Sequence, residues 1–76
     1  MTPGSFDLDT CKEVLGDAHC RLIEDNARAC AEGKAERSYL QFPDTTYFDR
    51  VSNNMCDIVW QAAYEKRKAR LERMRK

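Results

Sequence analysis

The chain has 76 residues, so we expect one small domain. Hydrophobic residues make up 42% of it and charged residues 34%, which is typical of a polar, helix-forming globular chain and excludes a large multidomain enzyme or a channel. We expect neither a membrane span nor a signal peptide, because no long apolar run is present and residues 1–10 lack a charged-then-apolar pattern. A domain of this size is rarely stable by more than ~3–5 kcal/mol, so oligomerisation or docking on a partner is expected.

The formal net charge of zero conceals an uneven distribution. Residues 1–65 hold six Lys/Arg and twelve Asp/Glu, a net charge of −6, whereas residues 66–76 hold seven Lys/Arg and one Glu, a net charge of +6. The latter segment is the basic patch: Lys66, Arg67, Lys68, Arg70, Arg73, Arg75 and Lys76. Such a run is either a solvated helix surface with favourable charges near a helix C-terminus, or a contact for phosphate, acidic protein or anionic lipid.

The first predicted helix covers about residues 10–33. Thr10 and Glu13 have the spacing of a capping box, and Gly33 is a plausible end of the helix. Apolar or small residues follow at helical intervals, which predicts one amphipathic helix. They are Leu8, Cys11, Leu15, Ala18, Leu22 and Ala29.

The second predicted helix covers about residues 45–76. Pro43 disfavours a helix that crosses it, and the hydroxyl of Thr46 with Asp49 three residues later predicts a helix start. Neither Gly nor Pro occurs in residues 44–76, so this helix should be the longer one, ~45 Å at 1.5 Å per residue. Its predicted buried face consists of Phe48, Val51, Met55, Ile58 and Ala62.

Two amphipathic helices joined by a short linker predict an all-α fold, an antiparallel two-helix hairpin that forms a single domain over residues 1–76. Tyr39, Leu40 and Phe42 make the linker apolar, so we expect them to cover one end of the core. Because the second helix is longer, residues 66–76 are expected to extend beyond the hairpin as a basic helical extension. Self-association or a partner would complete the core.

A second apolar stripe on the longer helix predicts a binding surface. At 100° per residue, Trp60 points away from the face assigned to the hairpin. Trp is frequently an anchor residue at protein interfaces. The alternatives are a homo-oligomer core, a site for a different protein, and an incidentally exposed Trp. The predicted partner-binding residues are Cys56, Trp60, Ala63, Leu71 and Met74.

The four cysteines, Cys11, Cys20, Cys30 and Cys56, contain no CxxC pair, and we predict no metal site. The Cys20-x9-Cys30 spacing resembles one half of the twin Cx9C helical hairpins of the mitochondrial intermembrane space. That resemblance implies structural disulfides in a subunit or assembly factor of a respiratory complex. The chain departs from the family because no second pair at this spacing includes Cys56. The alternative is four reduced thiols, with Cys11 in the core and the others half-exposed.

Catalysis is not expected, because the chain has one His and lacks a nucleophile elbow, a phosphate-binding loop and an HExxH motif. We therefore predict no enzyme, no cofactor and no bound metal. The favoured function is a small soluble interaction module, an adaptor, regulator or inhibitor of a larger protein complex, in the cytoplasm. The alternatives are the Cx9C-like subunit of the intermembrane space and, as the weakest, nucleic-acid binding through the basic patch.

Overall fold

The computed structural model describes residues 7–39 and 41–75, and these ranges contain three helices and no strand. Helix α1 is Leu8–Leu15, α2 is Asp17–Ala31 and α3 is Tyr47–Met74. The predicted all-α fold is confirmed. Over the described ranges, none of the helices combines the length and the apolar content that crossing a bilayer requires.

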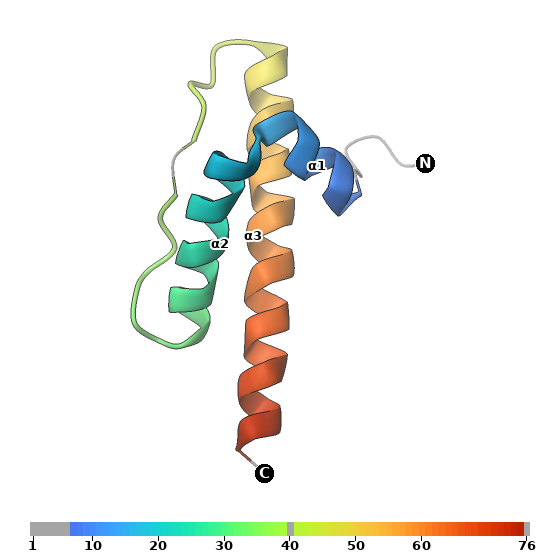
Figure 1. Cartoon of the computed structure of the whole chain (residues 1–76). Coiled ribbons are helices and arrows are strands. Elements are labelled where there is room, and N and C mark those ends of the chain that lie inside the picture. Colours follow the sequence, from blue (N-terminus) through green and yellow to red (C-terminus); the bar gives the residue numbers. More distant parts are fainter. Residues whose placement is uncertain (1–6, 40, 76) are drawn as a thin grey trace.

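Gly16 divides the first predicted helix into α1 and α2 (Figure 1). Its φ of +89° and ψ of 153° belong to a region of backbone conformation that essentially only glycine adopts. The Gly16 amide closes α1 by donating to the Lys12 carbonyl at 2.9 Å, and the Gly16 carbonyl accepts the Cys20 amide at 3.0 Å. The prediction of one unbroken helix is therefore wrong, because a single glycine redirects the chain.

The N-terminus of α1 is capped by Asp7, whose carboxylate accepts the Thr10 amide at 2.8 Å. Hydrogen bonding by the side chain of Thr10, and secondly by its amide, lowers the pKa of the Asp7 carboxyl, because it stabilises the charged form. The predicted start at Thr10 with Glu13 is wrong by one turn, since an upstream aspartate does the capping. The predicted stop at Gly33 is close to the observed end, where Gly33 has φ +76° and donates to the Cys30 carbonyl at 3.0 Å.

The break at Gly16 changes which face of α2 is buried. The uniform pattern predicted Ala18 and Leu22 in the core, but both are exposed, and Leu22 retains 59% of its accessible surface. Helix α2 instead buries Cys20, Ile23 and Ala27. An extended residue between two helices resets the helical phase, so the spacing from α1 does not carry over to α2.

Helix α3 begins and ends nearly as predicted. The Thr46 hydroxyl accepts the Asp49 amide at 3.1 Å, and the Asp49 carboxylate accepts the Thr46 amide at 3.2 Å. These reciprocal bonds are a capping box, which satisfies backbone donors that a helix start otherwise leaves unpaired. The 28-residue helix runs along the 45 Å long axis of the molecule.

Helices α2 and α3 run parallel, so the predicted antiparallel hairpin is wrong (Figure 1). In the side-chain contacts between the two helices, the residue number on α3 increases as the residue number on α2 increases. These contacts join His19 to Cys56 at 3.5 Å, Asn26 to Trp60 at 2.9 Å and Glu32 to Arg67 at 3.0 Å. In an antiparallel pair one number would fall as the other rises. The chain leaves the lower end of α2 and returns along its side before α3 begins.

The returning segment, residues 32–39 and 41–46, is attached to both helices. The Asn26 side chain accepts the Ser38 amide at 3.0 Å and donates to the Glu36 carbonyl at 3.1 Å. The Asn53 side chain makes the same type of pair with the backbone of Phe42, at 2.8 and 3.1 Å. These anchors explain why the segment follows the helices instead of forming a short turn. Tyr39 and Phe42 pack against the core as predicted, whereas Leu40 lies outside the described residues.

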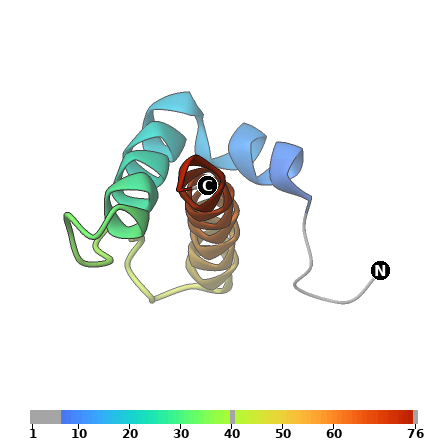
Figure 2. The same cartoon turned by 90° about the horizontal axis from the view of Figure 1, so that it is seen from below.

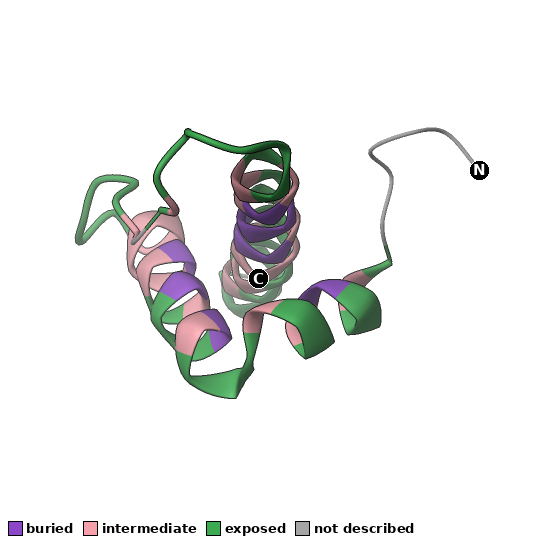
Figure 3. Ribbon diagram, turned by 90° about the horizontal axis from the view of Figure 1, so that it is seen from above, coloured by how far each residue is buried: buried purple, intermediate pink, exposed green. Residues whose placement is uncertain are grey.

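The core lies where all three helices meet. When the molecule is viewed along α3, helices α1 and α2 lie on different sides of α3 (Figure 2). The buried positions of the three helices face one another (Figure 3). The second apolar flank of α3, for which the sequence analysis predicts a partner or another copy, is thus covered by the chain's own α2. The buried residues are Cys11, Cys20, Ile23, Ala27, Ser52, Met55, Cys56, Val59 and Trp60.

Candidate functional site

Two of the predicted partner-binding residues lie inside the fold. Cys56 is 0% exposed and Trp60 is 6% exposed, and both belong to the core between α3 and α2. The Trp60 indole nitrogen donates to the Asn26 carboxamide at 2.9 Å, and its ring stacks on Tyr64 with centroids 4.8 Å apart. The predicted position of Cys56 and Trp60 on a free flank is therefore wrong, because that flank is the one that α2 covers.

The returning segment shields Trp60 further. The Arg37 guanidinium lies 4.3 Å from the centroid of the Trp60 ring, a cation–π arrangement, and pairs with Asp57 at 2.8 Å. The Tyr39 hydroxyl donates to the same carboxylate. These contacts fix a loop arginine across the indole, so Trp60 acts as the anchor of the fold rather than as an exposed contact residue.

The other three residues of the predicted stripe continue past the core. Ala63 is half-buried and packs against it, Leu71 is half-buried, and Met74 is 72% exposed. Helix α2 ends at Ala31, and the Glu32–Arg67 ion pair marks that level on α3. Leu71 and Met74 therefore lie about one to two turns beyond the last residue of α2 that could cover them.

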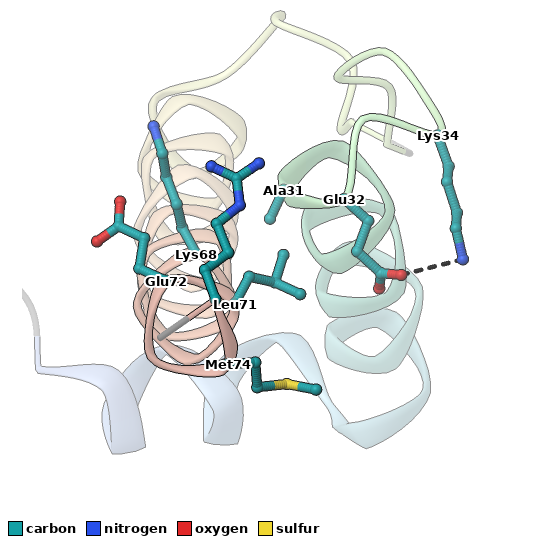
Figure 4. A pocket seen from close by; sticks show the side chains of 8 residues that line it. Ala31, Glu32, Lys34, Lys68, Leu71, Glu72 and Met74 are labelled. Atoms are coloured by element: carbon teal, nitrogen blue, oxygen red, sulfur yellow. Dashed lines mark ion pairs between the residues drawn. The ribbon is translucent and has the colours of Figure 1, made fainter.

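Leu71 and Met74 line a groove of about 460 Å³ at this end, which we call the terminal groove (Figure 4). Both side chains point toward the end of α2, so the groove has an apolar floor between the two helices. Charged side chains form its rim. The lining residues are Ala31, Glu32, Lys34, Lys68, Leu71, Glu72, Met74 and Arg75.

The charged residues that border the apolar floor are three cations, Lys34, Lys68 and Arg75, and two carboxylates, Glu32 and Glu72. Of the basic patch, Lys66–Arg75 lies on α3 or at its C-cap, and Lys76 lies outside the described residues. Arg67 is neutralised by Glu32, which also pairs with Lys34 at 3.0 Å. These partners lower the pKa of the Glu32 carboxyl, with the Lys34 hydrogen bond as the largest cause. Within the part of the chain that the structure describes, the remaining patch cations make no ion pair with a carboxylate.

A second, smaller cleft of about 220 Å³ lies between α2 and α3 and is also cationic. It is lined by Glu24, Arg28, Ala63, Lys66, Arg67 and Arg70. Ala63, the third residue of the predicted stripe outside the core, therefore borders this cleft and not the terminal groove. Positive charge thus extends from the end of α3 back toward the middle of α2.

Three of the four cysteines lie in the core. All four are free thiols, and Cys11, Cys20 and Cys56 are buried in one core, each from a different helix. Burial raises the pKa of each of these three thiols, and that of Cys56 from 9.0 to about 11. The prediction that Cys11 belongs to the core is confirmed. The prediction that Cys20 and Cys56 are half-exposed is wrong, because the phase change at Gly16 and the parallel packing turn both inward; Cys30 is half-buried as predicted.

We expect a thiol reagent to distinguish Cys30 from the other cysteines. Cys30 should react with the folded, reduced protein, whereas Cys11, Cys20 and Cys56 should react only as the chain unfolds, because they are buried and kept protonated. The measurement is a time course of labelling followed by mass spectrometry, with Cys30→Ser as the control that loses the fast phase. Protein that is purified without reductant and has no reactive thiol in denaturant would contradict this and favour a disulfide-stapled subunit.

Among residues 7–39 and 41–75, no three His, Cys, Asp or Glu side chains are arranged to hold a metal ion.

The functional residue that sequence reasoning missed is Asn26, which joins α2, the returning segment and Trp60. At 100° per residue Asn26 has the same azimuth as Leu8, so it lies at the edge of the predicted apolar stripe, and a polar residue at that position was the available signal. Comparisons with protein-family models, curated proteins and solved structures found no match to this chain.

Proposed function

We propose that the chain is a small, soluble, non-enzymatic interaction module that docks on a larger protein or complex. Docking uses the terminal groove and the basic patch, and Leu71 and Met74 are the contact residues at its centre. The observation that carries the proposal is the length of α3, which extends apolar side chains beyond the end of α2 and places them beside Lys68 and Arg75 of the basic patch. Trp60 and Cys56 have no part in docking, since they hold the fold together.

The energies favour such a role. Burying a Leu or Met side chain contributes ~1.5–3 kcal/mol, so covering Leu71 and Met74 is a sizeable gain for a chain of marginal stability. The exposed cations add less to affinity, but they accelerate association with an acidic surface and restrict the choice of partner.

Co-purification from the native source tests the proposal. We expect a tagged wild-type chain to retain a stoichiometric partner, and the double variant Leu71→Asp/Met74→Asp to lose it while keeping its helical circular dichroism. The matched control is Tyr47→Asp/Phe48→Asp, which adds the same two charges at the opposite end of α3, where Tyr47 is 82% and Phe48 67% exposed. A partner that binds the double variant as well as it binds the wild type would refute docking at this end.

A further inference from the structure

The terminal groove is an interrupted helix-packing surface. On α3 the residues that face α2 recur at intervals of three or four, at Trp60, Ala63, Arg67, Leu71 and Met74. This is the spacing of one side of a helix that packs along another helix. Helix α2 covers the first part of this side and ends at Ala31, so the rest has the geometry of a helix-binding surface without its helix. Another helix lying end to end with α2 would match this surface.

The charges around the groove decide the character of that helix. Residues 66–75 carry six Lys/Arg against one acid, Glu72. Lys68 and Arg75 are on the groove rim, and Arg70 is on the neighbouring cleft. A helix that enters here must supply carboxylates along both edges of its apolar face. The basic end of a second copy would instead bring like charges together, which is repulsive at short range.

The apolar floor argues against a polyanion as the occupant. Leu71 and Met74 form the apolar part of the groove together with Ala31, and a phosphate backbone would gain nothing from them. An amphipathic peptide segment can contact the apolar floor with its apolar side chains and pair with the cations at the edges.

We infer that the terminal groove binds a short acidic amphipathic helix of a partner protein. Its apolar side chains contact Leu71 and Met74, and its Asp and Glu side chains contact Lys68, Arg75 and the neighbouring cations. This inference rests on the proposed function and specifies the chemistry of the partner. The bound helix continues the α2 layer along α3.

A designed peptide tests the inference directly. The probe is a fluorescein-labelled peptide of ~15 residues with Leu at positions i, i+3, i+4 and i+7 and Glu on its other faces. We expect saturable binding by fluorescence anisotropy, which weakens several-fold between ~0.02 M and ~0.2 M salt. Leu71→Asp/Met74→Asp should reduce the affinity at least about tenfold, since each side chain loses its apolar contact. Lys68→Glu/Arg75→Glu should reduce it as well, and Tyr47→Asp/Phe48→Asp should leave it unchanged.

The control peptide has the same composition with its leucines dispersed over all faces. Equal binding of both peptides overturns the inference, because charge alone would then explain the affinity. Tighter binding of random duplex DNA overturns it in favour of a nucleic-acid ligand. Self-association in sedimentation that Leu71→Asp/Met74→Asp abolishes overturns it in favour of a second copy. If co-purification depends on Leu71 and Met74 but the acidic peptide does not bind, the proposed function stands and this inference alone fails.

Discussion

Replacing Trp60 with alanine is expected to abolish the cooperative unfolding transition of the chain. The indole is buried between α2 and α3, donates to Asn26, stacks on Tyr64 and lies under Arg37. Truncating a buried aromatic residue to alanine costs ~3–5 kcal/mol, which equals the whole stability expected for a domain of this size. The measurement is far-ultraviolet circular dichroism during heating and urea titration.

The control for this experiment is Phe48→Ala on the same helix. Phe48 retains 67% of its accessible surface, so its truncation should change the free energy of unfolding by no more than ~0.5 kcal/mol. If Trp60→Ala unfolds at the wild-type midpoint, the indole does not anchor the core. It would then return to the exposed, partner-binding role that the sequence pattern suggests.

Replacing Asn26 with alanine is expected to cost ~2–3 kcal/mol and to release the returning segment. The Asn26 carboxamide oxygen accepts from the Ser38 amide at 3.0 Å and from Trp60 at 2.9 Å, and its nitrogen donates to the Glu36 carbonyl at 3.1 Å. Alanine leaves the buried indole N–H without its acceptor, and an unsatisfied buried donor alone costs ~1–3 kcal/mol. Urea titration gives the free energy, and hydrogen exchange of the Ser38 amide reports the loop.

Asn54→Ala is the matched control, because Asn54 is an exposed asparagine on α3. It should leave both the urea midpoint and the exchange rate of the Ser38 amide near their wild-type values. If both asparagine variants give the same result, the hydrogen bonds of Asn26 contribute nothing beyond those of a surface residue. The chain would then hold the returning segment by other contacts, such as the Phe42–Asn53 pair.

The parts of the fold that could be predicted from the sequence are those with local causes. The all-α class follows from helical spacing, and the start of α3 follows from Thr46 and Asp49, which contact each other three residues apart. The end of α2 near Gly33 is equally local, because a glycine accepts the positive φ that terminates a helix. In each case the residues that decide the structure are near neighbours in the chain.

The errors have long-range or single-residue causes. Whether Gly16 is tolerated in a helix or breaks it depends on where α1 must pack, which spacing alone does not reveal. The parallel arrangement depends on contacts between Asn26 or Asn53 and a segment 11 or 12 residues away. The predicted linker, residues 34–44, is long enough either to turn or to run back along α2, since eleven residues span up to ~36 Å, and the spacing gives no sign of such anchors.

For the second apolar stripe on α3, the pattern was identified but the element that covers it was not. The spacing correctly identified a second apolar side that includes Trp60, Leu71 and Met74. It could not show that α2 covers the first of these and stops before the other two. The candidate site therefore consists of the part of the predicted stripe that lies beyond Ala31.

The parallel direction of α2 and α3 has a consequence for how the molecule folds. The contacts between the two helices join residues that are 37, 34 and 35 positions apart, so their separation is nearly constant along the pair. In an antiparallel hairpin, contacts near the turn close short loops and form first, and each later contact closes a slightly longer loop. In this chain every contact between α2 and α3 closes a loop of similar length. Folding must therefore begin with one such long-range closure, and we expect it to be slower than for a hairpin of equal size. During synthesis the core cannot form until Trp60 has left the ribosome, which places most of the chain outside before any of it is stable.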